Sequence, residues 1–188
     1  MKQALSQIIE NFPNIEIFSE SETHASIFLK DKNDIKNIVL SLKNELKFRM
    51  LIDVCGVDYP TNEKRFEVVY QLLNLEDNLR LTLKLQISEN EEVPSIDSIH
   101  SSACWFQRET FDMYGIFFSG SKDMRRILTD YNFQGFPLRK DFPLTGFVEL
   151  QYDSLAQKIV EVPVNLSQEY RNFDFETPWE SVQYSVKK

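Results

Sequence analysis

Residues 79–87 alternate strictly between apolar and polar side chains, and this pattern restricts the fold more than any other in the chain. An apolar residue at every second position places all of these side chains on one face of a β-strand. Such a strand is typical of an antiparallel sheet with one face on the core and the other in water. Residues 76–78, Glu-Asp-Asn, predict a hairpin back to a preceding strand over 65–75.

The rest of the first hundred residues supplies further elements of the same domain. Short strands are predicted over 15–18 and 23–30, and the mostly apolar run 48–57 predicts a central strand. One apolar stripe predicts a helix over 35–46, with Asp31 or Asn33 as its cap, and residues 2–10 favour a short helix. We therefore predict an α+β fold with helices on one face of a mixed, largely antiparallel sheet.

Composition excludes several classes of function. The 188 residues carry a net charge of −8, which opposes binding to nucleic acid or to an anionic membrane surface. No apolar run approaches the roughly 18 residues that span a bilayer, and the first residues do not have the pattern of a secretory signal. Cys55 and Cys104 lie far apart and form no CxxC pair, so we expect no iron–sulfur or zinc site built from this chain alone.

Two pairs of residues are candidates for catalysis. Glu109 and Asp112 share one face of a helix predicted over 97–113, and paired carboxylates can perform acid–base chemistry. Neighbouring arginines at 108, 125 and 126 can neutralise them, so structural ion pairing is the favoured interpretation. His100 and Cys104 are four residues apart on the same helix, but Cys104 is flanked by Ala103 and Trp105 as a core position would be. We predict no catalytic residues.

The second half of the chain is irregular but rich in aromatic residues. Prolines interrupt any long element after residue 136, while residues 131–188 contain eleven aromatic side chains. Disordered tails are poor in such residues, so we expect partner proteins to order this part. We predict an α+β domain over 1–114 and an extended, aromatic-rich partner-binding segment over 115–188.

One stretch of this second half is also distinctive as a sequence. It contains RETFDMYGIFF and DMRRILTDYNFQGFPLRKDFPLTG, followed by VELQYD, VEVPVNLSQEYRNFDF and TPWE. These motifs closely resemble the 30 kDa subunit family of respiratory complex I, whose bacterial members are called the C subunit. The likeness extends more weakly back to FRMLIDVCGVDYP and RFEVVYQLL, so it covers most of the chain from about Phe48.

The resemblance implies a cofactor-free structural subunit in the peripheral arm of a proton-translocating NADH:ubiquinone oxidoreductase. FMN and iron–sulfur clusters would then reside in other subunits, and electrons would pass from NADH to quinone through those groups. The implied partners are the 49 kDa-type quinone-site subunit and cluster-bearing neighbours, with no nucleic acid and no membrane span. The implied interface residues are Arg108, Glu109, Asp112, Gly115, Arg125, Arg126, Asp130, Tyr131, Gly135, Pro137, Arg139, Lys140, Asp141 and Trp179.

The sequence departs from the family pattern at four positions. Gln107, Ser121, Asn132 and Phe136 stand where relatives commonly have Glu, His, Gly and His, which puts a polar role of these positions in doubt. This divergence and a residue composition compatible with an AT-rich genome favour a mitochondrial gene, whose product would lie on the matrix side of the mitochondrial inner membrane. The alternative is the cytoplasmic face of a bacterial plasma membrane. Two other functions remain open: the equivalent scaffold subunit of a membrane-bound hydrogenase or plastid-type dehydrogenase, and a free-standing enzyme.

Overall fold

The computed structural model describes residue 9, residues 12–168 and residue 171, and these residues form two compact units. The first unit extends to Leu144 and the second begins at Thr145. Residues 115–144 therefore belong to the compact unit of the α+β domain, whereas the sequence-based division fell after residue 114. The helix predicted over 2–10 lies outside the described residues except for Ile9.

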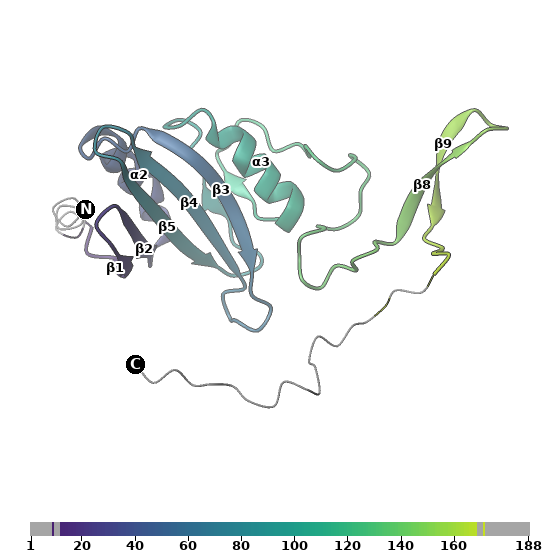
Figure 1. Cartoon of the computed structure of the whole chain (residues 1–188), viewed down its shortest axis with the longest axis horizontal. Coiled ribbons are helices and arrows are strands. Elements are labelled where there is room, and N and C mark those ends of the chain that lie inside the picture. Colours follow the sequence, from purple (N-terminus) through teal and green to yellow (C-terminus); the bar gives the residue numbers. More distant parts are fainter. Residues whose placement is uncertain (1–8, 10–11, 169–170, 172–188) are drawn as a thin grey trace. The chain divides into compact units, whose positions relative to one another are not determined.

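The first unit is built on a five-stranded sheet in the order β1-β2-β5-β4-β3 (Figure 1). Only the pairing of β2 with β5 is parallel in this sheet, and its other neighbours are antiparallel. This is the mixed, largely antiparallel sheet that the sequence predicts. The strands are β1 (Ile15–Glu20), β2 (His24–Leu29), β3 (Met50–Asp58), β4 (Phe66–Asn74) and β5 (Leu79–Ile87).

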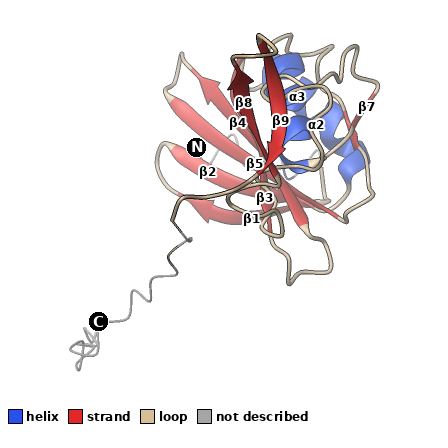
Figure 2. Ribbon diagram, turned by 90° about the vertical axis from the view of Figure 1, so that its right-hand side faces the viewer, coloured by secondary structure: helices blue, strands red, loops and turns tan. Residues whose placement is uncertain are grey.

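Two helices cover the same face of this sheet (Figure 2). The helix α2 (Ile35–Asn44) buries its predicted stripe, and it follows a single 3-10 turn, η1 (Lys32–Asp34). Asp31 caps this turn by accepting a hydrogen bond from the Asn33 backbone N–H. The second helix, α3 (Ala103–Tyr114), packs against β3. The α+β fold class is confirmed.

The alternation of β5 produces the core as predicted. Its apolar residues at 81, 83, 85 and 87 are buried, and they meet the buried apolar side chains of β4 at 66, 68, 70 and 72. The opposite face is less open than expected, because Thr82 is buried and hydrogen bonds to Gln71 and His24. The hairpin at residues 75–78 is closed by Asn78, which has a positive φ of 52°.

Two predicted features are wrong. Among the described residues β3 lies at the edge of the sheet and not at its centre, because its apolar side chains pack against α3 and only one of its edges pairs with a strand there. The helix predicted over 97–113 begins only at Ala103. Residues 97–102 form turns, in which the His100 N–H donates to the Ile96 carbonyl. His100 therefore precedes the helix and does not share a helical face with Cys104.

The close approach of α3 to β3 depends on Gly56. A Cβ at this position would lie 2.8 Å from Tyr114 Cδ2 and 3.2 Å from Ile116 Cδ1. We expect Gly56→Ala to lower the free energy of unfolding by about 1–3 kcal/mol, because overpacking forces neighbours to move. Urea denaturation measures this loss. Tyr114→Leu should recover part of it in a double mutant, and strictly additive losses would contradict the steric explanation.

Two small two-stranded sheets complete the secondary structure of the described residues. In the first unit, β6 (Val93–Pro94) pairs in parallel with β7 (Phe118–Ser119) and ties the chain after α3 to the loop after β5. The second unit contains an antiparallel hairpin of β8 (Val148–Asp153) and β9 (Lys158–Pro163). No helix among the described residues is both long enough and apolar enough to cross a membrane.

Candidate functional site

The candidate site is the charged network where residues 115–144 return along α3, which we name the return segment. Gly115 makes this return possible by ending α3 in the left-handed conformation, with φ of +77°. Its N–H donates to the Phe111 carbonyl at 2.8 Å. A Cβ on this residue would lie 2.6 Å from the Phe136 ring and 2.7 Å from Arg139 Nη2. Only glycine fits both the backbone conformation and the space.

Asp112 is the centre of the first half of the network. Its carboxylate is fully buried, and Oδ2 accepts hydrogen bonds from three successive backbone N–H groups, at Ile127, Leu128 and Thr129. Oδ1 accepts from the Thr129 hydroxyl and from Arg126 Nη1 at 2.8 Å. A single side chain of α3 therefore fixes a whole turn of the return segment.

Two arginines complete this half. Arg108, one turn before Asp112 on α3, is buried and donates to the backbone carbonyls of Arg125 and Arg126. Arg126 Nη2 reaches the Gly135 carbonyl at 3.0 Å, so it bridges α3 to a later part of the return segment. Its guanidinium also lies 5.2 Å from the Phe136 ring centroid. The forked donors of arginine suit such multiple carbonyl acceptors.

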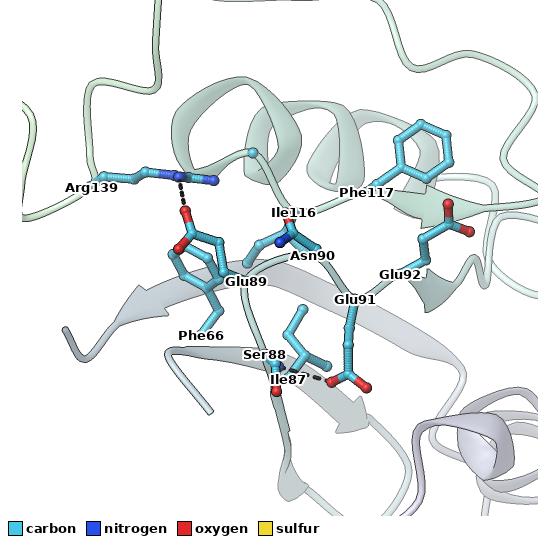
Figure 3. A pocket seen from close by; sticks show the side chains of 11 residues that line it. Phe66, Ile87, Ser88, Glu89, Asn90, Glu91, Glu92, Ile116, Phe117 and Arg139 are labelled. Carbon is cyan, nitrogen blue, oxygen red and sulfur yellow. Dashed lines mark hydrogen bonds and ion pairs between the residues drawn. The ribbon is translucent and has the colours of Figure 1, made fainter. Parts of the chain in front are cut away.

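Arg139 organises the second half. Its Nε donates to the Tyr114 carbonyl at 2.6 Å, which is one of the carbonyls left unpaired at the end of α3. Nη1 pairs with Glu89 at 2.6 Å, and this contact forms one wall of a cavity of about 220 Å³ (Figure 3). The guanidinium lies between two rings, 5.0 Å from the Phe66 centroid and 4.7 Å from the Phe136 centroid.

Asp58 and Arg65 connect this half to the sheet. Asp58 is buried at the end of β3, and Arg65 pairs with both of its oxygens, at 2.7 and 2.9 Å. Arg65 also pairs with Asp141 at 2.9 Å, and the Lys140 N–H donates to Asp58 Oδ2 at 2.7 Å. The end of the return segment is thereby held to the β3–β4 hairpin.

Neighbouring hydrogen-bond donors keep the buried carboxyls of Asp112 and Asp58 ionised. Burial by itself would raise the pKa of Asp112, but the hydrogen bonds from Thr129, Arg126 and Leu128 outweigh burial and hold this pKa well below its usual range. The hydrogen bonds from Arg65 lower the pKa of Asp58, against an opposing contribution from burial. At neutral pH both groups are therefore anions surrounded by donors.

These lowered pKa values predict a loss of stability in acid. A carboxyl with a lower pKa in the folded state stabilises the fold above its unfolded-state pKa, near 4, and loses that contribution as pH falls through the folded-state pKa. We expect the melting temperature to be flat between pH 7 and 5 and to fall steadily below about pH 4. Thermal unfolding at successive pH values measures this. Asp112→Asn should flatten the acid side of the profile, and an unchanged slope would contradict its role.

The structure places the predicted interface residues in three environments. Arg108 and Asp112 are buried, and Gly115, Arg126 and Arg139 are half-buried in the network described above; Pro137 is also half-buried. Trp179 lies outside the described residues. The solvent-exposed members are Glu109, Arg125, Asp130, Tyr131, Gly135, Lys140 and Asp141.

The candidate catalytic pairs are separated by the fold. Asp112 is buried and paired with Arg126, whereas Glu109 is exposed and takes part in none of the ion pairs found among residues 12–168. His100 is buried with no hydrogen-bond partner for Nε2 among the described residues, and burial lowers its pKa. In the part of the chain that the structure describes, no three His, Cys, Asp or Glu side chains are grouped to hold a metal ion.

Sequence reasoning missed Asp58, Arg65 and Glu89. The predicted strands 48–57 and 65–75 provide a usable signal for the first two, since a hairpin between these strands brings their ends together. No local pattern points to Glu89, which lies 50 residues from Arg139.

Two of the four departures from the family pattern have clear structural roles. Phe136 packs its ring against Phe111 and supports both Arg126 and Arg139. Gln107 is fully buried, and its Oε1 accepts from the Ser95 hydroxyl at 2.7 Å while its Nε2 has no partner among the described residues. The Ser121 hydroxyl donates to the Asp123 carbonyl at 3.5 Å, and the Asn132 carbonyl accepts from the Gln134 side chain.

Comparison with known proteins identifies the family. The model of the family described as "Respiratory-chain NADH dehydrogenase, 30 Kd subunit" matches residues 28–148. The C subunit of NADH-quinone oxidoreductase from Methylobacterium radiotolerans is 59% identical over 137 residues, which is 73% of this chain and 64% of that protein. The chain thus spans somewhat less than two thirds of that relative. The C subunit from Mesorhizobium japonicum is 51% identical over 82% of this chain and 78% of its own length.

A solved structure shares the fold. A chain of the membrane-bound sulfane sulfur reductase, an archaeal respiratory membrane complex, is similar with a TM-score of 0.67 and 26% identity, over 76% of this chain and 85% of that one. The two relatives named above are bacterial, so they agree with the bacterial alternative and give no support to a mitochondrial gene. Together, the match over residues 28–148 and the identities above 50% show that the chain belongs to the 30 kDa subunit family of respiratory-chain NADH dehydrogenase.

Proposed function

We propose that this chain is a cofactor-free structural subunit in the peripheral arm of a proton-translocating NADH:quinone oxidoreductase. It supports electron transfer from NADH to quinone without contributing a reacting group, and it works on the cytoplasmic side of a bacterial plasma membrane. Its partners are the quinone-site subunit and the neighbours that bear FMN and iron–sulfur clusters. Residues 115–188 supply the partner-binding segment, with the exposed members of the predicted interface set facing those partners.

The main support for this proposal is that charged residues of the family motif bind other groups of the same chain. Asp112, Arg126 and Arg139 form hydrogen bonds with other groups of this chain, and each of the three is at least half-buried. Reactive groups in an active site need access to a substrate, whereas these groups already bind other groups of this chain. Such a network suits a rigid support for a surface that other subunits recognise.

The hairpin of β8 and β9 is the strongest candidate for that surface. Apolar residues at 148, 150, 152, 159 and 163 share one face with Glu161, which lies opposite Leu150, and all of them are exposed, with Tyr152 at 66% and Ile159 at 67%. An isolated two-stranded hairpin is marginally stable in water, and an exposed apolar face of this kind marks an interaction site. We assign this face to contact with a neighbouring subunit.

The alternative is the equivalent subunit of a related membrane-bound hydrogenase or plastid-type dehydrogenase. The similar chain of the sulfane sulfur reductase complex is consistent with a scaffold used by several respiratory assemblies. Identities of 51–59% to subunits named for NADH-quinone oxidoreductase, against 26% to that chain, favour the NADH enzyme.

Complementation tests the proposal. The tagged chain would be expressed in a bacterium that lacks its own gene for the 30 kDa-type subunit, and membranes would be analysed by affinity purification and by native gels stained for NADH dehydrogenase. We expect co-purification with a flavin-containing NADH module and restored NADH:quinone activity. Co-purification with hydrogenase subunits would support the alternative. Turnover by the purified chain alone, abolished by Glu109→Gln, would overturn the structural role.

A variant in the hairpin tests its assigned face. Leu150→Asp should lower the amount of assembled complex several-fold, because a charge on an apolar interface loses hydration without gaining a partner. The free chain should melt as before, since Leu150 is already exposed. Gln151→Asp is the matched control, because its side chain points to the opposite face of β8. Equal assembly of the two variants would remove the hairpin face from the interface.

A further inference from the structure

The exposed apolar face of the β8–β9 hairpin carries one charged side chain at its centre. Directly paired residues of antiparallel strands point to the same face, and Glu161 of β9 pairs with Leu150 of β8. Their Cβ atoms are then about 4.5–5.5 Å apart, so the stem of Glu161 lies beside Leu150. The pairs on either side along this face are apolar: Val148 with Pro163, and Tyr152 with Ile159.

The hairpin supplies no counter-charge on this face. Glu161 is exposed and takes part in none of the ion pairs found in the described part of the chain. Within β8 and β9, both fully described, Lys158 is the one basic residue, and it alternates onto the opposite face with Val160 and Val162. Water therefore solvates the Glu161 carboxylate in the free chain.

A partner that covers this face must also deal with the carboxylate. Apolar contacts exclude water, and a carboxylate that is removed from water without a partner is costly. A wholly apolar partner would therefore lose at Glu161 part of the free energy that it gains at Leu150 and Tyr152. A basic side chain at this point instead forms an ion pair shielded from water, and its aliphatic stem extends the apolar contact.

Charge complementarity decides between the possible occupants of the face. Residues 169–188 of this chain are rich in aromatic side chains, but between 169 and 180 four acidic residues outnumber one arginine. Their net negative charge opposes Glu161, as does the charge of an anionic lipid surface. A neighbouring subunit that carries a basic side chain within an apolar segment meets both requirements of the face.

The dimensions of the face suit a helix. Two paired strands lie about 4.7–4.9 Å apart, and an α-helix with its side chains is about 10–12 Å across, so one helix covers both strands. Packing against a helix also gives a two-stranded hairpin the support that it lacks in isolation. An amphipathic helix presents an apolar stripe in which a single position can hold lysine or arginine.

We infer that the apolar face of the β8–β9 hairpin receives an amphipathic helix of a neighbouring subunit, with one lysine or arginine of that helix paired to Glu161. The inference rests on the proposed function, because it requires that the chain assembles with partner proteins. It adds the chemistry that the partner supplies and makes Glu161 the specificity-determining residue of the contact. The apolar residues alone would accept any apolar surface, whereas the carboxylate rejects those without a cation.

Three substitutions of Glu161 separate this inference from a purely apolar contact. Glu161→Lys opposes two like charges, so assembly should weaken about tenfold or more. Glu161→Gln removes the counter-charge and should weaken assembly less. Glu161→Leu enlarges the apolar face, so a wholly apolar partner would assemble as well as before or better. A partner with a cation would instead keep that cation unpaired, and assembly should fall.

The experiment uses the full chain and the complementing strain described above. Each variant would be compared for the melting temperature of the free chain and for assembled complex on native gels. Glu149→Lys is the matched control, because it makes the same change of charge on the opposite face of the hairpin. We expect all variants to melt like the unmodified chain, since Glu161 is exposed, and the three Glu161 variants alone to assemble poorly.

A photo-cross-linker on the same face identifies the occupant. Tyr152→p-benzoylphenylalanine, irradiated in the purified complex, should link to a neighbouring subunit, in a peptide with apolar residues at helical spacing and one lysine or arginine. Replacing that basic residue by glutamate should restore assembly of Glu161→Lys. A link to residues 169–188 of the same chain, to phospholipid, or to a peptide without a basic residue would overturn the inference.

The outcomes keep this inference separate from the proposed function. If the unmodified chain assembles and the Glu161 variants assemble like Glu149→Lys, no cation meets the carboxylate, although the proposed function stands. If the unmodified chain does not assemble with NADH dehydrogenase subunits at all, the proposed function itself fails. A lowered melting temperature of the free Glu161 variants would also contradict the inference, because it would assign the carboxylate to intrachain support.

Discussion

Replacement of Asp112 by asparagine is expected to lower the free energy of unfolding by about 3–5 kcal/mol, the usual effect of removing one member of a buried charged network. The carboxylate accepts three backbone N–H groups on one oxygen and Arg126 and Thr129 on the other. An asparagine amide would direct N–H donors toward donors in either orientation. Arg126 would also remain partly buried without its counter-charge.

Urea denaturation and limited proteolysis of the free chain measure this effect. The return segment, residues 115–144, should become the first site of cleavage, because Asp112 fixes the turn at 127–129. Glu109→Gln is the matched control on the same helix, since Glu109 is exposed. If Asp112→Asn remained within about 0.5 kcal/mol of the unmodified chain, as surface substitutions do, apolar packing and not the carboxylate would hold the segment.

The second large effect is expected for Arg139→Ala in the complex. This substitution removes the hydrogen bond to the Tyr114 carbonyl, the pair with Glu89 and the stacking on Phe66 and Phe136. We expect a loss of about 2–3 kcal/mol in the free chain, from charged hydrogen bonds that are largely shielded from solvent. Assembled complex should fall much more than the activity of each complex that does assemble.

Native gels with NADH dehydrogenase staining separate these quantities. Arg139→Lys should have an intermediate effect, because it keeps the charge but not the fork or the stacking plane. Arg125→Ala should change the stability of the free chain little, since the Arg125–Asp123 pair lies at the surface. Normal amounts of complex with low activity per complex would instead place Arg139 in the chemistry.

Much of the fold could be predicted because its signals are local. The alternation over 79–87 and the apolar stripe over 35–46 are each set by residues that are close in sequence and lie within a single element. The two errors come from the same limit. The apolar run 48–57 does not distinguish a strand between two strands from an edge strand beside a helix. Likewise, local pattern alone does not show that residues 97–102 form turns and that the helix begins only at Ala103.

The candidate site was only partly predictable because its contacts are distant in sequence. Glu109 and Asp112 are equivalent as residue types at helical spacing, yet one is exposed and the other accepts hydrogen bonds from residues 14–17 positions away. The Lys140 N–H meets Asp58 across 82 positions. A motif can indicate that such charges matter, but not whether they face the chain itself or a partner.

Residue patterns were enough to predict the α+β class, most strand and helix positions, and the resemblance to the 30 kDa subunit family. The sheet order, the parallel pairing of β2 with β5, and the attachment of residues 115–144 to the first unit emerged only from the folded chain. The physical reason is the distance in sequence between the residues that interact. Periodicity reports the faces of single elements, whereas the burial of Asp112 and the stacking of Arg139 exist only once distant segments meet.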